Sequence, residues 1–367
     1  MKQKVKNKYK IVVYAIAKNE EQFVDRWMDS MSEADEVIVL DTGSTDNTVQ
    51  KLKARGAKVY QEIISPWRFD AARNRSLNLV PQDADICVCT DLDEVFNKGW
   101  RDILERAWQP GVKQARYIYN WSLDNQGNPL VWFYYFKIHT RNDFVWKNPV
   151  HEYLKFVGSD YKVIWIDDIV LNHYPDPNKS RSSYLPLLEL SVQENPEDDR
   201  SWYYLGREYM YCGEWDKSIQ TLQHYLKIDG NKFPQERCAA MRDIANCYFK
   251  KNDYLNACKY YLMAIAQCPY MREPYVELAL AAYYNKDYPT VFFMAEQALK
   301  IKEKSKVYIN QGYAWDYTLP DIAAIACYHL RLYDRAYDYA KMALELKPDD
   351  SRLKENYEIL KRYSSKQ

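Results

Sequence analysis

Two aspartates, Asp91 and Asp93, follow the short apolar run 86–90 and are candidates for binding a divalent cation. The run has the composition of a buried strand, and in extended chain the side chains at positions i and i+2 point to the same side. We therefore expect both carboxylates to aim at one point while Leu92 points back into the core. Converging carboxylate oxygens suit Mg²⁺ or Mn²⁺, and such a cation also holds a diphosphate. Acid pairs after apolar runs are common, so this interpretation depends on the segments that precede the pair.

Three strand–helix units lead up to the acid pair. Strands are predicted at 9–17, 36–40, 58–63 and 86–90, and helices at about 23–31, 46–55 and 69–79. Ser44 or Thr45 is expected to cap the second helix. Strand–helix repeats of this length predict right-handed crossovers and a parallel sheet. Ligands of such sheets bind beyond the carboxyl ends of the strands, where Asn19, Glu20 and Asp41 also fall.

Four segments carry a resemblance to a known family. They are AIAKNEE, VIVLDTGSTDNT, FDAARNRSL and VCTDLDE, in this order and spacing. Together they resemble the nucleotide-sugar half of family 2 glycosyltransferases with the GT-A fold, strongly over residues 9–110 and more weakly to about residue 180. The resemblance implies a nucleotide-sugar donor, with a UDP-sugar as the first choice, and a divalent metal.

The resemblance also implies roles for individual residues. At the first two strand ends, Ala15, Asn19, Glu20 and Asp41 would surround the nucleoside. Taken singly, Asn19 and Asp41 equally suit turn formation and capping.

Phosphate and metal contacts are implied for the next two motifs. Arg73 would lie near the phosphates, with Asn74 supporting the loop, although Arg73 also suits a solvated helix surface. Asp91 and Asp93 would bind the cation, and Asp91 would also contribute to the nucleotide site.

An aromatic-rich hairpin follows the acid pair. Two strands, 116–121 and 131–140, are predicted to flank a turn at 124–129. The aromatic side chains of this region are Trp121, Trp132, Phe133, Tyr134, Tyr135, Phe136 and Trp146. Most are expected in the core, and some would form a platform for a sugar or a peptide.

Two later residues stand where the resemblance places catalytic and metal-binding groups. In GT-A enzymes the acceptor strand ends in an acidic residue that serves as base in inverting members, and a later His completes the metal shell. The resemblance thus implies Glu152 as the catalytic base and His173 as the metal ligand that joins Asp91 and Asp93. His151 is the rival metal or phosphate contact, and either His also suits a structural role. No covalent nucleophile is evident, which favours inversion.

Helical patterns replace strand patterns near residue 180. The motif W-x-x-L-G-x-x-Y at 202–209 matches the start of a tetratricopeptide repeat, and three further units follow in register to Pro348. An insertion is expected around 302–318 and a closing helix at 351–362. The predicted fold class is thus α/β, with a GT-A domain at 1–180 and a mostly parallel sheet, followed by an all-α repeat domain at 181–367.

Composition favours a cytoplasmic enzyme. The 51 basic and 51 acidic residues balance, so no overall field favours nucleic acid or an anionic membrane. No segment approaches the roughly 20 apolar residues of a membrane span. The basic start, residues 1–10, is interpreted as a solvated tail, and the eight Cys are interpreted as reduced core residues.

The repeat array directs the choice of acceptor. Such arrays present extended surfaces to peptides and proteins. The whole arrangement resembles the bacterial transferases that glycosylate a bacteriocin peptide such as sublancin, so a peptide or protein acceptor is the first choice. A cell-envelope or capsular glycan is the second, and the array could instead form a homodimer.

Two other functions stay open. The first domain could be inactive, which would leave a scaffold protein whose repeats recruit a partner. A sugar-nucleotide pyrophosphorylase shares this sheet type but carries a Gly-rich loop after its first strand. Residues 18–21 contain no glycine there, which argues against that activity.

Overall fold

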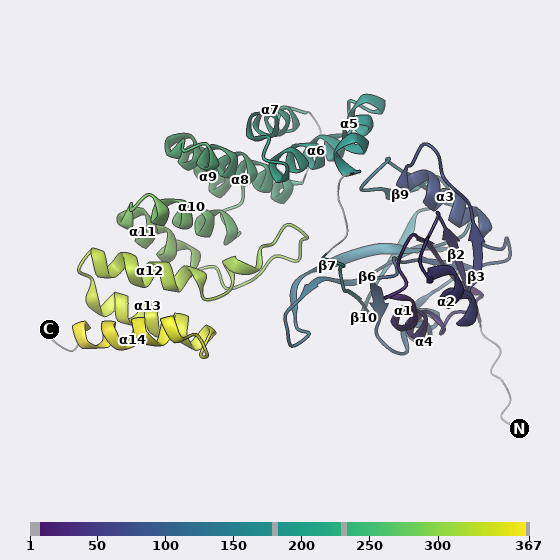
Figure 1. Ribbon diagram of the computed structural model, residues 1–367, viewed down its shortest axis with the longest axis horizontal. Helices are drawn as coiled ribbons and strands as arrows, with labels where there is room; N and C mark the ends of the chain where they lie inside the picture. The colour runs from purple at the N-terminus through teal and green to yellow at the C-terminus, as the bar shows by residue number, and fades with distance from the viewer. Residues whose placement is uncertain (1–7, 178–182, 229–232, 365–367) are drawn as a thin grey trace, which may run out of the picture. The chain divides into compact units, whose positions relative to one another are not determined.

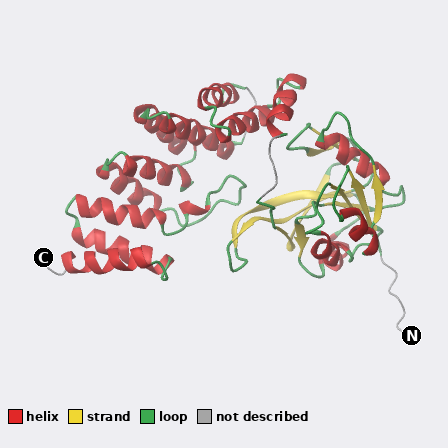
Figure 2. Ribbon diagram, in the orientation of Figure 1, coloured by secondary structure: helices red, strands yellow, loops and turns green. Residues whose placement is uncertain are grey.

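The computed structural model describes residues 8–177, 183–228 and 233–364. The chain divides into two compact units, residues 1–194 and 195–367, here called the N-terminal and the C-terminal unit. The expected domain boundary between residues 180 and 181 lies outside the described residues. In Figure 2, the described strands belong to the N-terminal unit and the C-terminal unit is helical.

The N-terminal unit is built on an eight-stranded sheet with the order β3-β2-β1-β4-β7-β6-β10-β5. Its strands are β1 (Ile11–Ala17), β2 (Glu36–Asp41), β3 (Lys58–Gln61), β4 (Ile86–Cys89), β5 (Glu94–Phe96), β6 (Val112–Leu123), β7 (Pro129–His139) and β10 (Lys162–His173). The block β3-β2-β1-β4 and the pair β6-β10 are parallel, whereas β7 and β5 run antiparallel to their neighbours. The predicted α/β class with a mostly parallel sheet is confirmed. A separate ribbon pairs β8 (Phe144–Lys147) with β9 (Tyr153–Phe156).

Helices cover both faces of this sheet, as Figure 1 shows. They are α1 (Val24–Met31), α2 (Thr48–Ala54), α3 (Phe69–Leu79) and α4 (Trp100–Ala107). A further helix of this unit, α5 (Tyr184–Glu194), does not lie on the sheet. Successive side chains of a strand point to opposite faces, so β1 contributes to two cores. Val13 packs in one core with Trp27 and Trp100, whereas Tyr14 packs in the other with Leu77.

The carboxyl ends of β1, β2 and β4 lie at one edge of the sheet. In the strand register, Ala17 faces Asp41 across the β1–β2 pair, and Tyr14 faces Cys89 across the β1–β4 pair. Because parallel strands end at the same edge, the segments that follow them meet there. This edge carries the loops in which the sequence places most of the candidate residues.

The acid pair has a different backbone from the expected one. Strand β4 ends at Cys89, and the Glu94 N–H donates to the Asp91 carbonyl oxygen at 3.1 Å, which closes a turn. The prediction that Asp91 and Asp93 lie in extended chain and point the same way is therefore wrong. The physical reason is that β5 starts at Glu94 and pairs antiparallel with β10, so the chain must change direction. Leu92 is buried as expected.

The expected cap of α2 is also wrong. The helix begins at Thr48, and neither Ser44 nor Thr45 caps it. The Ser44 hydroxyl instead donates to the carboxylate of Asp41. Asp46 Oδ1 accepts the Thr48 N–H at 3.0 Å. The Ser44 hydroxyl thus serves as a donor to the buried Asp41 carboxylate and does not accept a hydrogen bond from an N–H group at the start of α2.

The C-terminal unit consists of successive helix pairs, which confirms the expected repeat architecture. Its helices are α6 (Asp199–Tyr211), α7 (Trp215–Tyr225), α8 (Pro234–Lys250), α9 (Tyr254–Gln267), α10 (Glu273–Tyr284), α11 (Tyr288–Ala298), η1 (Gly312–Ala314), α12 (Thr318–His329), α13 (Tyr333–Leu346) and α14 (Ser351–Ser364). Gly206 explains the close approach of α6 and α7, because a Cβ atom there would lie 2.5 Å from the Leu222 side chain. The insertion before α12 and the closing helix α14 fall where the sequence predicts them.

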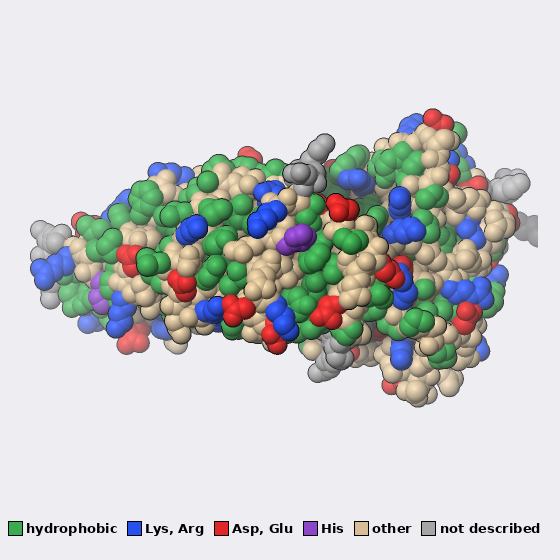
Figure 3. All heavy atoms as spheres, turned by 90° about the horizontal axis from the view of Figure 1, so that it is seen from above, with side chains coloured by type: hydrophobic (Ala, Val, Ile, Leu, Met, Phe, Trp, Pro, Cys, Tyr) green, Lys and Arg blue, Asp and Glu red, His purple; other side chains and the backbone are tan. Residues whose placement is uncertain are grey.

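Among the described residues, no helix is both long enough and apolar enough to span a bilayer. On the face shown in Figure 3, acidic and basic side chains are interspersed, in keeping with the formal net charge of zero.

Candidate functional site

The loops after β1 and β2 are tied to each other by side-chain hydrogen bonds. Asp41 is fully buried, and its Oδ1 accepts the N–H groups of Gly43 and Ser44, both at 3.2 Å. Asn19 has a left-handed backbone (φ 55°), and its Oδ1 accepts the Thr45 N–H at 2.7 Å. Both side chains thus shape turns, and their contact with a nucleoside stays a prediction.

Ala15 and Glu20 lie at the same edge, and main-chain atoms of both residues make hydrogen bonds to neighbouring helices. Ala15 is fully buried, and its carbonyl oxygen accepts the hydroxyl of Ser76 from α3 at 2.8 Å. The Glu20 N–H donates to the Thr48 hydroxyl at the start of α2, at 2.8 Å. These contacts join the end of β1 to α2 and α3.

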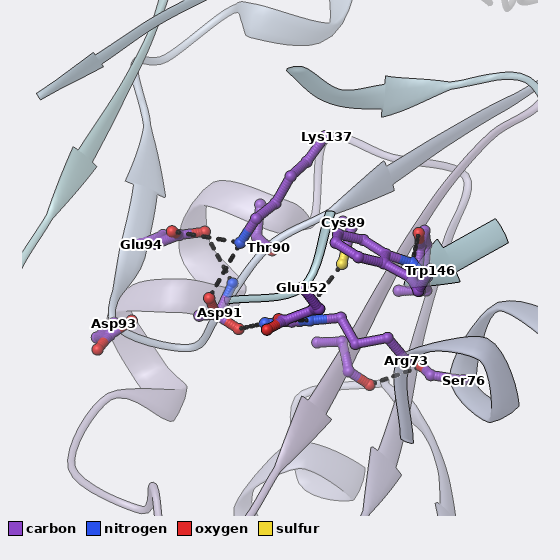
Figure 4. A network of polar contacts seen from close by, with 12 residues as sticks. Arg73, Ser76, Cys89, Thr90, Asp91, Asp93, Glu94, Lys137, Trp146 and Glu152 are labelled. Atoms are coloured by element: carbon purple, nitrogen blue, oxygen red, sulfur yellow. Dashed lines mark hydrogen bonds and ion pairs between the residues drawn. The ribbon is translucent and has the colours of Figure 1, made fainter. Parts of the chain in front are cut away.

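Arg73 of α3 connects the two acidic residues that the sequence assigns to metal binding and to catalysis. Its Nη2 lies 2.6 Å from Asp91 Oδ1, and its Nε lies 2.7 Å from Glu152 Oε1 (Figure 4). Only 4% of its side chain is exposed. Burial lowers the pKa of Arg73, but the charges of Asp91 and Glu152 raise it well above its usual value. The guanidinium is thus committed to two carboxylates, and its contact with phosphate stays a prediction.

Lys137 of β7 is a second buried cation in this network, and its role was not predicted from the sequence. Its Nζ lies 3.1 Å from Asp91 Oδ2 and 3.8 Å from Glu94 Oε1. Glu94 in turn accepts the Asp91 N–H at 2.9 Å and the Tyr119 hydroxyl at 2.8 Å. Burial raises the pKa of Glu94, and Lys137 opposes that shift. The available signal was a lone Lys within the apolar run of 131–140.

Asp93 and His173 form a second polar pair, apart from this network. In the register of β5 and β10, His173 faces Glu94, and this brings His173 Nε2 to 3.5 Å from Asp93 Oδ2. In Figure 4, the Asp93 carboxylate lies to one side of the Arg73–Asp91–Glu152 contacts. Burial lowers the pKa of His173, but the hydrogen bond and charge of Asp93 raise it above its usual value.

The residues of this pair fit part of a metal site. His173 Nδ1 lies 3.0 Å from the Trp121 carbonyl oxygen, which can only accept, so Nδ1 carries the proton and the lone pair of a neutral ring sits on Nε2 beside Asp93. Such second-shell contacts orient histidine ligands. Both oxygens of Asp91, however, already contact cations. Within the described residues, no three His, Cys, Asp or Glu side chains are grouped closely enough to hold an ion, so the three-ligand set stays a prediction.

The elements around Glu152 are held by main-chain contacts to α3. The side-chain amide of Asn74 donates to the Trp146 carbonyl oxygen and accepts the Trp146 N–H, both at 2.9 Å. The Phe69 N–H donates to the Pro149 carbonyl oxygen at 2.9 Å. Asn74 thus holds strand β8 instead of the expected loop, and these contacts keep the chain leading to Glu152 against the helix that carries Arg73.

The aromatic residues of this region are less buried than expected. Of the seven, Trp146 is buried and Trp121 is exposed, and the other five, Trp132, Phe133, Tyr134, Tyr135 and Phe136, are half-buried. The prediction that most of them lie in the core is therefore wrong. Trp146 is 1% exposed, and its ring lies 5.3 Å from the Arg73 guanidinium. Trp121 is 49% exposed and stacks on the His173 ring at 4.6 Å. His151, the rival ligand, makes an edge contact with the ring of Tyr184. A ligand platform at Trp121 stays a prediction.

The contacts therefore bring together Arg73, Asp91 and Glu152 in one group, and Asp93 with His173 in a second. The nucleoside candidates lie on the loops of neighbouring parallel strands. A buried cation–carboxylate network at the carboxyl edge of a parallel sheet can orient an anionic ligand and a proton acceptor side by side.

Residues 12–156 match the model of the glycosyl transferase family 2. A relative from Rickettsia bellii, named an uncharacterized glycosyltransferase, is 33% identical over 110 residues, which cover 30% of this chain and 36% of the relative. Another of the same description, from Rickettsia typhi, is 48% identical over 59 residues, which cover 16% of this chain and 19% of that protein. The chain thus spans about a third or less of the length of these curated relatives.

Solved helical-repeat proteins resemble the chain at low identity. A crystal structure of MamA is 18% identical with a TM-score of 0.38, covering 49% of this chain and 99% of that one. The crystal structure of YrrB, described as a TPR protein, is 13% identical with a TM-score of 0.39, covering 48% of this chain and 84% of that one. The N-terminal match alone points to a family: over residues 12–156 the chain is similar to family 2 glycosyltransferases.

Proposed function

We propose that this protein is a metal-dependent, inverting glycosyltransferase that moves a sugar from a nucleotide sugar, with a UDP-sugar as the first choice, to a peptide or protein. The observation that carries the proposal is the contact of Arg73 with both Asp91 and Glu152, at the carboxyl edge of the sheet within the region similar to family 2 glycosyltransferases. The relatives named glycosyltransferases support sugar transfer. A cytoplasmic location is part of this proposal.

On the donor side, the protein must accommodate the negative charge that the diphosphate gains as the glycosidic bond breaks. Asp93 and His173 would hold the divalent cation, which would neutralise part of that charge when bound. Arg73 and Lys137 keep Asp91 in one orientation beside this site. The loops after β1 and β2 would contact the nucleoside through Asn19, Glu20 and Asp41. Hydrogen bonds between and within these two loops hold their geometry.

On the acceptor side, Glu152 would take the proton from the attacking hydroxyl or thiol. Its Oε1 receives the Arg73 Nε–H, which fixes the plane of the carboxylate. Only 11% of the Glu152 side chain is exposed, so bulk water competes little for that proton. Attack in one step on the face opposite the leaving diphosphate inverts the anomeric carbon.

The acceptor is chosen from the C-terminal unit. Stacked helix pairs offer an extended surface, which suits an extended peptide, and a sublancin-type peptide acceptor follows from the sequence resemblance. A cell-envelope or capsular glycan is the alternative acceptor. Self-association through the helix pairs is compatible with either.

The test is a screen of nucleotide sugars for release of the nucleoside diphosphate with Mn²⁺ and with chelator, followed by mass spectrometry of candidate acceptors. We expect one nucleotide sugar to be hydrolysed slowly, only with metal, and Asp93→Asn to abolish release. Asp83→Asn is the matched control, because Asp83 is 73% exposed and pairs with Lys10. A protein that binds the nucleotide sugar but never releases diphosphate would instead be an inactive domain fused to a scaffold.

A further inference from the structure

The insertion between α11 and α12 lies on the repeat array as an irregular segment of turns and one short helix. We call residues 302–317 the strap; it contains the short helix η1 and joins the last two helix pairs (Figure 1). Ile309, Asn310 and Ala314 within it are buried. The strap therefore packs against the array instead of projecting from it.

The strap covers the inner layer of the array. Helices α6, α8, α10 and α12, the first of each pair, contact one another in succession, and α10 and α12 both contact η1. In stacked helical repeats the extended binding surface is concave. Here part of the inner layer is already occupied by the chain itself.

The strap contacts carboxylates of α8 and α10 through aromatic donors. The Tyr308 hydroxyl donates to Glu236, the Tyr313 hydroxyl donates to Glu277 at 2.6 Å, and the Trp315 indole N–H donates to Glu273 at 3.1 Å. The three glutamates are 6%, 4% and 1% exposed. Carboxylates are rarely buried to this extent without a partner, so these groups are suited to the donors that cover them.

Main-chain and stacking contacts add to these hydrogen bonds. Arg242 of α8 donates to the Ile309 carbonyl oxygen at 3.4 Å, and Glu273 accepts the Gln311 N–H at 3.3 Å. Arg272 stacks its guanidinium on Trp315 at 3.9 Å. Of the three glutamates, Glu277 is also paired with Arg242, whose Nε lies 3.0 Å from each carboxylate oxygen. Aromatic anchors that donate to buried acceptors are features of a bound peptide.

We propose that the inner face of α8 and α10 is a peptide-binding groove, that the strap is its built-in ligand, and that the groove's partner is a peptide with tyrosine or tryptophan donors. A tethered segment has an effective concentration of about a millimolar, so it excludes a micromolar peptide of similar affinity. The inference does not depend on sugar transfer, because it concerns binding by the C-terminal unit alone.

A separate pocket lies at the end of the strap. Beyond Trp315, a pocket of about 400 Å³ lies between α10, α12 and α14, with Tyr283, Tyr284, Tyr317 and Leu280 in its walls. Tyr317, at the end of the strap, is one wall of this pocket. A peptide that replaced the strap would have room for a further aromatic or aliphatic side chain there.

The experiment adds a labelled synthetic peptide with the sequence of residues 302–317 to the full-length protein and follows fluorescence anisotropy. In one variant, residues 303–314 are replaced by a glycine–serine linker of equal length. We expect this variant to bind the peptide at least tenfold more tightly than the unaltered protein does. A peptide in which Tyr308 and Tyr313 are changed to phenylalanine should bind the variant less well, because these two hydroxyls donate to the buried glutamates. A folded variant that fails to bind, or an unaltered protein that binds equally well, would overturn the proposal.

If the linker variant does not fold, a milder variant tests the same proposal. Tyr308→Phe with Tyr313→Phe removes two hydroxyl donors and keeps both rings, so the strap should release more easily and peptide binding should rise. Tyr337→Phe is the matched control, since its hydroxyl contacts Tyr357 between α13 and α14. If the double variant binds the peptide no better than the control, the strap is a fixed part of the array and not a ligand.

Discussion

Two cations converge on Asp91, one on each carboxylate oxygen. Arg73 and Lys137 lie at 2.6 Å and 3.1 Å, and both side chains are almost fully buried. Asp93, two residues on, instead faces His173. The two carboxylates of the motif are therefore in different environments, although their spacing suggested one shared role. Asp91 belongs to a buried charge network, and Asp93 is the carboxylate beside a histidine nitrogen.

Lys137→Met tests the importance of this network for stability. Removing the cation leaves Asp91 and Glu94 near each other without their shared partner, and breaking a buried ion pair costs about 3–5 kcal/mol. We expect a loss of that order in the free energy of unfolding by urea. Lys113→Met is the control, because its pair with Asp143 is partly solvated and should contribute less than about 1 kcal/mol. Equal effects of the two changes would mean that the network is not a special source of stability.

Glu152→Gln tests the proposed base. Glutamine can still accept the Arg73 Nε–H, so the local geometry should persist while proton acceptance is lost. Sugar transfer should fall by roughly 10²-fold or more, with nucleotide binding unchanged in calorimetry. The exposed Glu62, paired with Arg75, gives the control Glu62→Gln. Transfer at near the unaltered rate would point to Asp124 or His151 as the base instead.

At the scale of elements, sequence patterns predicted what depends on local composition. The strands β1, β2 and β4 are apolar runs with buried side chains, and α3 follows from its helical spacing. The turn at Asp91 could not be predicted, because it depends on β5 pairing with β10, some 80 residues away. Lys137 was missed for the same reason: its two carboxylate partners come from another part of the sheet.

One buried chain of hydrogen bonds joins three elements and makes stability depend on pH. His139 Nδ1 lies 2.8 Å from the Thr140 carbonyl oxygen, so Nδ1 carries the proton and Nε2 accepts the Tyr14 hydroxyl at 2.8 Å. The Tyr14 oxygen accepts the Trp146 indole N–H at 2.9 Å. Burial lowers the pKa of His139 from 6.5 to about 4. The ring is therefore neutral in the folded protein over most of the acidic range.

The free energy of unfolding should therefore fall as the pH drops from 6.5 to about 4. In that window the unfolded chain binds a proton at His139 that the folded chain does not, at a cost of up to about 3 kcal/mol. Urea titrations at several pH values measure the slope. His139→Gln should flatten it, whereas the same change at the exposed His224 should not. An unchanged slope in His139→Gln would assign the pH dependence to other groups.

At the scale of the molecule, each unit has its own hydrophobic cores. The sheet of the N-terminal unit is buried between two core clusters, and the helix pairs of the C-terminal unit contain two others. Helix α5 belongs with the N-terminal unit: Glu194 pairs with Arg68 at 2.6 Å, and the ring of Tyr184 meets Phe69. These contacts favour a division after residue 194 rather than near residue 180.

A shortened chain ending at Asn195 should fold and keep metal-dependent hydrolysis of the nucleotide sugar, because the candidate catalytic residues all lie before that point. It should lose transfer to a peptide acceptor. A chain ending at Asn178 should melt at a lower temperature, since it lacks the contacts of α5 with Arg68 and Phe69. Differential scanning fluorimetry and mass spectrometry of the acceptor measure both. Full-rate transfer by the Asn195 chain would remove the C-terminal unit from acceptor binding.

The central claim is that the carboxyl edge of the sheet binds a nucleotide diphosphate with the help of a divalent cation at Asp93 and His173. Titration calorimetry of the full-length protein with UDP, in Mn²⁺ and in chelator, tests it most directly. We predict clear binding with Mn²⁺, at least tenfold weaker binding in chelator, and loss of that difference in Asp93→Asn. Equal affinity for UDP in Mn²⁺ and in chelator would contradict the account.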